Sequence, residues 1–146
     1  METVILYYTF GGSTKKEAER LAKELNAPLY PVKESRNRNF VSAFVPGGFL
    51  AMRRKSTPIR PLNVDLNKYD RIIVGSPVWA GYPAPAFNSI LEMLPAGKKI
   101  ELFLCSGGGD TSKSRQGTIE WAESKGCTVL SYRDVSTGTP PGKSKE

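Results

Sequence analysis

Short apolar runs alternate along the chain with segments whose apolar residues recur at helical spacing. Four runs are largely apolar, as buried strands are: 3–8, 69–75, 99–105 and 127–133. Three segments between or after them place apolar residues three and four positions apart, as on one face of a helix: 15–25, 84–94 and 112–124. Strands that alternate with helices predict an α/β domain with a parallel, doubly wound sheet.

The second strand and the connection after it are less regular. Residues 29–32 form a short apolar run that contains Pro31, which lacks the backbone N–H needed inside a sheet, so we expect this strand at an edge. The connection 34–68 is long, and short helical segments are expected within it at 40–45 and 49–52. A connection of this length normally carries function or covers a face of the sheet.

Three chemically unusual loops follow the first, third and fourth strands, at 9–14, 76–82 and 106–111. In parallel doubly wound sheets, ligands bind beyond the carboxyl ends of the strands. The first loop carries hydroxyls and glycines, the second offers Trp79 and Tyr82 for stacking on a flat ring, and the third is rich in glycine. Because all three loops lie at the same edge, we expect one ligand site between them.

The first loop has the composition of a phosphate-binding turn. It leads from a strand into a helix, whose first N–H groups have no partner within the helix and favour anions. Thr14 and Glu17 match a capping box, and Lys15 and Lys16 occupy the first turn, where the helix dipole disfavours cations unless an anion is bound. The loop by itself leaves a second interpretation open, a βα turn whose glycines serve only its tightness.

Composition limits the classes of protein that the chain can belong to. A length of 146 residues fits one domain, for which we expect the range 1–135, with 136–146 as a mobile tail rich in Gly, Pro, Lys and Ser. Histidine is absent, which excludes Ser-His and Cys-His nucleophile pairs and histidine-ligated metals, so we expect neither a catalytic side chain nor a metal site. No apolar stretch is long enough to span a membrane, and no secretory signal pattern opens the chain, so we expect a cytoplasmic protein.

The net charge of +7 is concentrated in the segment 35–64, which has six cations and no acid: Arg36, Arg38, Arg53, Arg54, Lys55 and Arg60. Such a segment attracts an acidic protein or a phosphorylated cofactor, or it only keeps the chain soluble.

The two cysteines, Cys105 and Cys127, are expected at opposite ends of neighbouring strands, about 20 Å apart at ~3.3 Å per residue. A disulfide requires Cα atoms within about 7 Å, so both thiols should be free.

Two motifs resemble the flavodoxin family. The run Thr9–Thr14 looks like its phosphate loop, and Tyr69-Asp70 together with the run Gly75–Pro85 is similar to the signature of a flavodoxin-like subfamily. The resemblance covers residues 3 to about 133. It implies a three-layer sandwich with a five-stranded parallel sheet in the order 2-1-3-4-5, and non-covalent binding of FMN.

By position, the resemblance also implies which residues contact the cofactor. They are Thr9, Phe10, Gly11, Gly12, Ser13 and Thr14 in the phosphate loop, Pro77, Val78, Trp79, Ala80 and Gly81 along the isoalloxazine ring, and Ser106, Gly107, Gly108, Gly109 and Asp110 on its other side. The chain departs from the family in three ways. Gly11 stands where a threonine is common, the third loop lacks an aromatic residue, and the net charge is basic, whereas electron-carrying flavodoxins are usually acidic.

The family's C-terminal helix has no counterpart in the sequence. Its loss should leave apolar sheet surface beside the first helix, which either a homodimer or the 34–68 connection would cover. Three functions remain open: an electron carrier that exchanges electrons with a partner such as an acidic ferredoxin-like protein, an FMN-dependent reductase that oxidises NAD(P)H and reduces a small molecule such as a quinone, and a flavodoxin-like module without cofactor. We expect neither a nucleic acid nor a membrane as partner.

Overall fold

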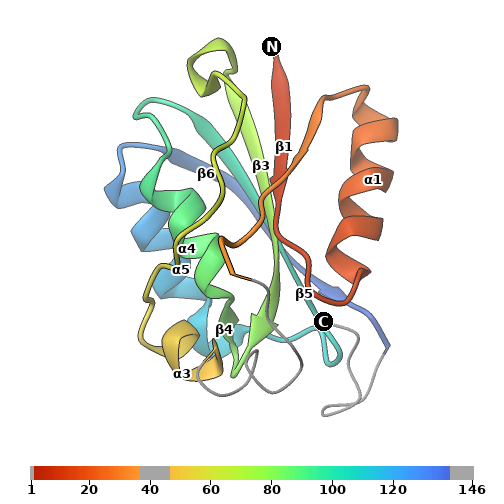
Figure 1. Ribbon diagram of the computed structural model, residues 1–146, viewed down its shortest axis with the longest axis vertical. Coiled ribbons are helices and arrows are strands. Elements are labelled where there is room, and N and C mark those ends of the chain that lie inside the picture. The colour runs from red at the N-terminus through yellow and green to blue at the C-terminus, as the bar shows by residue number, and fades with distance from the viewer. Residues whose placement is uncertain (1, 37–46, 139–146) are drawn as a thin grey trace.

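A parallel sheet with helices on both faces forms the centre of the protein (Figure 1). The computed structural model describes residues 2–36 and 47–138. The strands are β1 (Thr3–Tyr7), β2 (Leu29–Pro31), β3 (Arg71–Trp79), β4 (Tyr82–Pro83), β5 (Lys99–Ser106) and β6 (Thr128–Ser136). The helices are α1 (Ser13–Leu25), α3 (Gly47–Met52), α4 (Pro85–Glu92) and α5 (Ser112–Ser124), with a 3₁₀ turn η1 (Leu66–Lys68).

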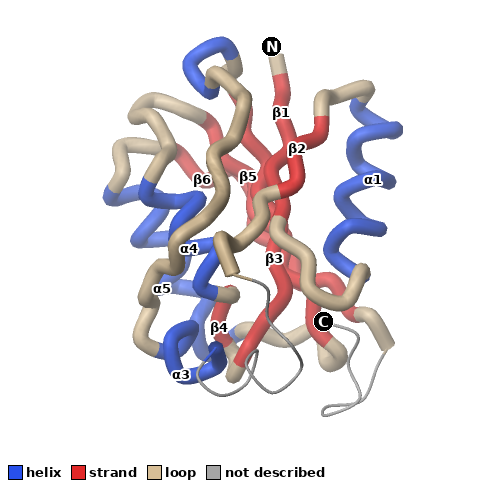
Figure 2. The backbone as a smooth tube through the Cα atoms, viewed as in Figure 1, coloured by secondary structure: helices blue, strands red, loops and turns tan. Residues whose placement is uncertain are grey.

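The sheet has the predicted strand order. The main strands lie in the order β2-β1-β3-β5-β6, all parallel, which is 2-1-3-4-5 when the small β4 is left out. Strand β2 is at the edge, where Pro31 pairs with Tyr7, so the missing N–H of the proline costs no ladder hydrogen bond (Figure 2). The predicted fold class and the edge position of the second strand are therefore confirmed.

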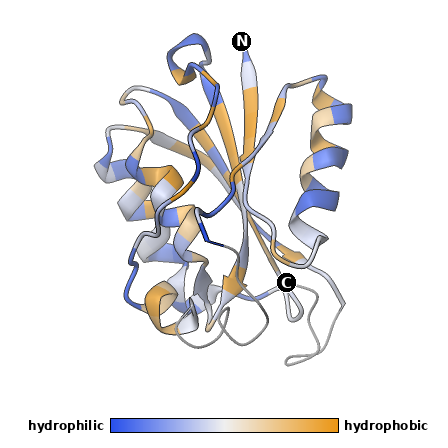
Figure 3. Cartoon of the chain, viewed as in Figure 1, coloured by the Kyte–Doolittle hydropathy of each residue, from blue (hydrophilic) through white to orange (hydrophobic). Residues whose placement is uncertain are grey.

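Side chains of successive residues in each strand point to opposite faces of the sheet. In β1, Val4 and Leu6 belong to the core under α4 and α5, whereas Ile5 and Tyr7 belong to the core under α1. Helix α1 covers its face without another described helix, and α4 and α5 lie together on the opposite face (Figure 1). The strands are the most hydrophobic part of the molecule, and the surface of α1 is largely hydrophilic (Figure 3).

The described part of the long connection lies on the α4 face. The predicted helical segment at 49–52 is the end of α3, and the one expected at 40–45 lies outside the described residues. Ile59, Leu62 and Val64 pack against the core under α4 and α5. The expectation that this connection covers the sheet beside α1 is therefore wrong for the described residues, because its apolar side chains pack on the opposite face.

The sheet surface beside α1 is polar rather than apolar. A groove of about 310 Å³ lies there, and charged side chains of α1, β3, β5 and β6 line much of it. Arg71 pairs with Glu101 across β3 and β5, and the guanidinium of Arg133 lies 5.8 Å from the ring centroid of Phe103. The expected apolar patch is thus replaced by ion pairs, which need no covering helix. Within the described residues no helix follows β6, and a homodimer stays a prediction.

Both cysteines are buried and neither forms a disulfide, as predicted. Cys105 pairs in register with Val135 near the end of β6, and Cys127 precedes the first residue of that strand, so the two thiols belong to opposite ends of the sheet. Strand β6 ends at Ser136, one residue inside the segment expected to be a tail.

Candidate functional site

The first loop leads from β1 into the uncapped start of α1. Gly12 is the N-cap with φ = 112°, a conformation that side chains rarely adopt, and its N–H donates to Thr9 Oγ1 at 3.1 Å. No side chain caps the helix and no acidic residue lies in its first turn. A Cβ built on Gly12 meets no atom within 4 Å, so the space above this helix terminus is open. The loop therefore has the form that an anion-binding turn requires.

The predicted capping box is wrong. Thr14 lies inside α1 and is fully buried, because the helix begins one residue earlier, at Ser13. The Glu17 carboxylate pairs with Arg20 and Arg133 at 2.7 Å each. The first turn is thus free of acidic side chains but retains Lys15 and Lys16.

The second predicted loop is mostly strand. β3 continues through Trp79 and turns back through Ala80 and Gly81 into β4. Both turn residues have positive φ, 55° and 85°, as a two-residue type I′ hairpin requires. The prediction of a loop at 76–82 is therefore wrong over 76–79 and at 82, since only 80–81 lie between the two strands.

The hairpin is tied to the start of α4. The N–H of Ala84 donates to the carbonyl of Pro77 at 3.1 Å and to Ser76 Oγ at 3.3 Å, and Pro85 follows as the first residue of the helix. A proline is favoured at this position because the first N–H of a helix has no partner in any case. Much of the family-like run from Gly75 to Pro85 thus encodes a hairpin and a helix start.

Trp79 is a core residue in this structure. Its side chain is fully buried, with Tyr8 and Phe10 edge-on to its ring at centroid distances of 6.0 and 5.7 Å. The sequence suggested that this ring stacks on a flat ligand, whereas here it packs on protein. The contact with Phe10 joins the hairpin to the first loop.

The third loop is held by its own polar groups. Ser106 Oγ accepts the N–H of Gly109 at 2.9 Å, and the carbonyl of Ser106 accepts the N–H of Thr137 at 2.9 Å. Gly109 has φ = 66°, and a Cβ there would lie 2.8 Å from Ser136 Cβ. Asp110 accepts the N–H of Ser112 at 2.8 Å, and its hydrogen bonds with the Ser112 backbone and side chain lower the pKa of the carboxyl. Asp110 therefore accepts a hydrogen bond from the first residue of α5 at the exposed surface.

A hydroxyl cluster that the sequence did not reveal supports the start of α5. Thr111 is 1% exposed, and its Oγ1 lies 2.5 Å from both Tyr132 Oη and Asp134 Oδ1. Burial, followed by the charge of Asp134, raises the pKa of Tyr132. Tyr132 and Asp134 lie on β6, so their hydrogen bonds with Thr111 hold the third loop against the last strand. Sequence offered no signal, because Tyr132 and Asp134 look like ordinary strand residues.

Arg54 follows α3 in the chain, and its side chain contacts both α5 and the hairpin. Its guanidinium donates to Thr118 Oγ1 at 2.9 Å and to the carbonyl of Ser114 at 3.0 Å, and it lies 5.1 Å from the ring centroid of Tyr82. A Cβ on Gly117 would lie 2.7 Å from a guanidinium nitrogen, so this glycine makes room for the cation. A glycine inside the predicted helix 112–124 was the one sign of this contact in the sequence. Burial lowers the pKa of Arg54.

The three predicted loops therefore lie side by side. Phe10 and Trp79 join the first to the second, and Ser114 Oγ donates to the carbonyl of Gly81 at 2.7 Å, which joins the second to the helix that follows the third. Contact of the predicted site residues with a ligand stays a prediction. The described cations of the segment 35–64 do not gather in one place. Arg54 is half-buried against α5, Arg53 lies 5.2 Å from the Phe49 ring centroid, and Arg38 is outside the described residues.

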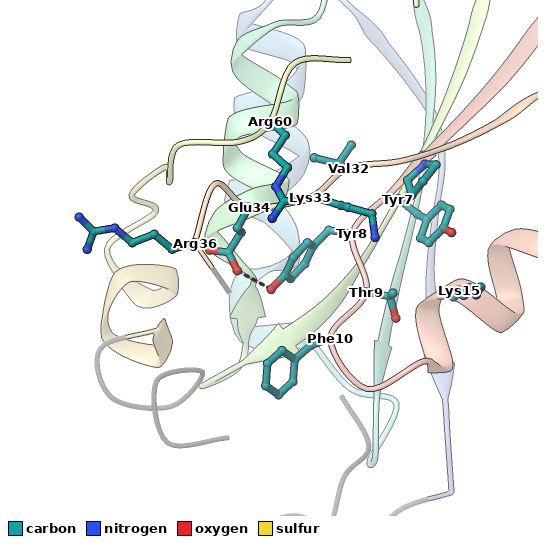
Figure 4. A pocket seen from close by; sticks show the side chains of 11 residues that line it. Tyr7, Tyr8, Thr9, Phe10, Lys15, Val32, Lys33, Glu34, Arg36 and Arg60 are labelled. Atoms are coloured by element: carbon teal, nitrogen blue, oxygen red, sulfur yellow. Dashed lines mark hydrogen bonds between the residues drawn. The ribbon is translucent and has the colours of Figure 1, made fainter. Parts of the chain in front are cut away.

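A pocket of about 610 Å³ opens beside the first loop (Figure 4). The end of β1 and the residues after β2 form its walls, and four cations line it: Lys15, Lys33, Arg36 and Arg60. Its one acidic side chain, Glu34, is 7% exposed and accepts a hydrogen bond from Tyr8 Oη at 2.5 Å. The hairpin and the third loop do not line this pocket.

The described part of the chain holds neither a metal-binding cluster nor a membrane-spanning helix. No group of three or more Cys, Asp or Glu side chains is placed to hold a metal ion there. No described helix is long and apolar enough to cross a membrane.

Comparison with solved structures identifies the family. A flavoprotein from Lactobacillus acidophilus, crystallised in complex with FMN, is 31% identical, with a TM-score of 0.73 over 91% of this chain and 93% of that one. A putative flavoprotein from Bacteroides eggerthii has a TM-score of 0.79 at 19% identity over 90% and 86%, and oxidised flavodoxin 2 from Bacillus cereus has 0.52 at 18% over 92% and 86%. No family model and no curated protein matches the chain. The chain belongs to the flavodoxin-like flavoproteins.

Proposed function

We propose that this chain binds FMN non-covalently at the carboxyl edge of its sheet and carries electrons between redox partners. The observation that carries the proposal is the open, uncapped start of α1 at Gly12, preceded by the Thr9 hydroxyl and followed by Lys15 and Lys16. A phosphate dianion there accepts hydrogen bonds from N–H groups of the first turn and offsets the unfavourable effect of the helix dipole on the two lysines. The FMN-bound relative from L. acidophilus supports the same ligand.

The residues fit FMN beyond its phosphate. The hairpin tip at Ala80 and Gly81 and the loop from Ser106 to Asp110 flank the first loop at the same sheet edge, so a ring system extending from the phosphate passes between them. With Trp79 buried, the backbone of the hairpin and the side chain of Tyr82 form the contact surface on that side. The third loop contributes glycine backbone, which a ring can approach closely.

The protein positions the cofactor and leaves the redox chemistry to it. FMN supplies one- and two-electron transfer when bound, and histidine is absent from the chain, so the chain contributes binding, orientation and electrostatics. Arg54 and Lys113 lie 5.1 and 5.6 Å from the Tyr82 ring centroid and place positive charge behind the hairpin. Such charge favours electron-rich, anionic groups at the site.

Titration of flavin-free protein tests the proposal. FMN should bind far more tightly than riboflavin, because charge-assisted hydrogen bonds to the phosphate are roughly twice as strong as neutral ones. Equal affinities would refute the phosphate assignment, and no binding of either would show a module without cofactor. Anaerobic addition of NADH or NADPH to the FMN-loaded protein then separates the two redox functions. Direct reduction indicates a reductase, and reduction only through a protein donor indicates a carrier.

A further inference from the structure

The 610 Å³ pocket beside the first loop is a binding site in its own right. It shares Thr9, Phe10 and Lys15 with the loop and the first turn of α1, but no residue of the hairpin or of the third loop lines it. A flavin ring held between those two loops therefore lies on the other side of the phosphate position. The pocket is large enough for a small ligand, which typically needs about 300–1,000 Å³.

Two of the pocket cations are held directly opposite each other. Glu34 and Ile59 form an antiparallel bridge beyond β2, with hydrogen bonds from the N–H of Arg60 to the carbonyl of Lys33 at 2.8 Å and from the N–H of Ser35 to the carbonyl of Pro58 at 2.9 Å. Lys33 and Arg60 are thus cross-strand neighbours although they are 27 positions apart in the chain. Like charges in this arrangement destabilise a strand pair unless an anion lies between them.

The charge balance of the pocket favours a multivalent anion. Four cations line it against the single carboxylate of Glu34, which Tyr8 Oη already contacts. Within the described residues, none of the side chains of Lys15, Lys33, Arg36 and Arg60 forms an ion pair with an acid. Figure 4 shows Lys33 and Arg60 close together at the pocket, with Lys15 at the start of α1. Guanidinium and ammonium groups together are the donors that proteins use for phosphate.

We propose that this pocket is a second phosphate subsite, which takes a nucleotide phosphate next to the one held by the first loop. The inference rests on the proposed function, because it treats the first loop as the site of the flavin phosphate. The second phosphate has two sources, the adenylate half of FAD or a separate nucleotide bound beside FMN. In both cases Lys33 and Arg60 contact it, and Lys15 lies between the two phosphates.

The test compares the double variant K33S/R60S with the double variant K23S/K125S. Both remove two positive charges, but Lys23 and Lys125 lie outside the pocket, in the last turn of α1 and at the end of α5. Pyrophosphate is added to flavin-free protein and the thermal midpoint is measured at constant ionic strength. Wild type and K23S/K125S should gain several degrees more than K33S/R60S, because a ligand that binds only the folded state stabilises it.

Two further arms identify the source of the phosphate. If it belongs to FAD, K33S/R60S should lose roughly tenfold in FAD affinity and keep its FMN affinity, taking each exposed charge contact as worth about threefold. If the second phosphate belongs to a separate nucleotide, AMP should bind to FMN-loaded wild type. K33S/R60S loaded with FMN should then bind AMP roughly tenfold more weakly. The proposal is overturned if K33S/R60S matches K23S/K125S in all three measurements. Failure of FMN to bind would refute the proposed function alone, since the pyrophosphate measurement needs no flavin.

Discussion

The far end of the Phe103 ring occupies the space above Gly75, its register partner on the neighbouring strand, so a Cβ on Gly75 would lie 2.0 Å from Phe103 Cζ. Gly75 also pairs in register with Tyr7, the last residue of β1, so this contact is level with the start of the first loop. Overpacking a core typically costs about 1–3 kcal/mol, so Gly75→Ala should lower the free energy of unfolding by that amount in urea denaturation. Gly108→Ala is the control, since a Cβ there meets no atom within 4 Å.

A second substitution distinguishes steric conflict from a general effect at Gly75. Phe103→Leu shortens the ring that blocks the Cβ, so the double variant Gly75→Ala/Phe103→Leu should be less destabilised than the sum of the two single variants. Strict additivity, or a Gly75→Ala protein as stable as Gly108→Ala, would contradict the packing explanation.

Gly12 allows a test of the phosphate site by charge alone. Gly12→Asp and Gly12→Asn add side chains of the same shape at φ = 112°, so both carry the same type of backbone strain, on the order of 1–3 kcal/mol. Only the aspartate places a negative charge where the phosphate approaches. We expect Gly12→Asp to bind FMN at least tenfold more weakly than Gly12→Asn by flavin fluorescence quenching. Equal loss in both variants would show that the first loop responds to strain rather than to charge.

Local patterns predicted the fold because each strand and helix carries its own signal. The unbroken apolar run at Ile72–Val74 and the proline at position 31 placed a central and an edge strand correctly. The helix at 112–124 was also predicted with its observed bounds, although its buried face proved to be Ser114, Thr118 and Ala122. Ser114 and Thr118 are polar, so the hydrophobic pattern of the sequence did not mark them as inward-facing. Hydrogen bonds of their side chains, rather than hydrophobicity, allow them to be buried.

The site was less predictable, because its geometry depends on contacts between distant residues. Nothing in the sequence near Trp79 indicates that Tyr8 and Phe10 bury its ring, and nothing near Arg54 indicates that Tyr82 and α5 hold it. The five described cations of 35–64 do not form one cluster, although they are close in sequence. In the structure Arg36 and Arg60 join Lys15 and Lys33, which lie outside or at the margin of that segment.

Arg53 and Arg54 are adjacent but should differ in their contribution to stability. Arg54 donates two hydrogen bonds to α5 and lies over Tyr82, whereas Arg53 contacts only the exposed Phe49 ring among the described aromatic side chains. Arg54→Met should lower the free energy of unfolding by roughly 1–3 kcal/mol, because the buried carbonyl and hydroxyl lose a charged donor. Arg53→Met should change it by less than about 0.5 kcal/mol. Equal effects in thermal denaturation would show that the Arg54 contacts do not stabilise the hairpin.

Stability should depend on the charge of Glu17 at acidic pH. Hydrogen bonds from Arg20, together with those from Arg133, lower the pKa of Glu17 below its ordinary value of 4.5. A lowered folded-state pKa means that the unfolded chain binds the proton more readily, so the stabilisation is present above about pH 4.5 and is lost as the pH falls through the folded pKa. Glu17→Gln should therefore be less stable than wild type at pH 7 and equal to it at the lowest pH. Glu123→Gln, whose carboxylate forms no ion pair within the described residues, should show no such convergence.

The surface of α3 is where we expect an acidic redox partner to dock. Phe49 and Met52 are 57% and 49% exposed, Arg53 and Lys55 are exposed beside them, and a Cβ on Gly48 would lie 3.4 Å from Ala80 at the hairpin tip. Aromatic residues, Met and Arg are enriched in protein interfaces, and positive charge there raises the rate of association with an acidic protein. This surface therefore adjoins the proposed flavin site.

Arg53→Ser/Lys55→Ser removes the charge of this surface and keeps Arg54, whose loss would disturb the hairpin. The assay measures reduction of the FMN-loaded protein by a reduced acidic ferredoxin. At low salt we expect the variant to be reduced roughly three- to tenfold more slowly than wild type. Its rate should also depend less on salt concentration, because less electrostatic attraction is left for salt to screen. K23S/K125S lowers the net charge equally at a distance from α3, so it should keep most of the wild-type rate. If the two variants are slowed equally, only the overall charge steers the partner, and α3 is not its docking surface. If neither is slowed, the association does not depend on charge.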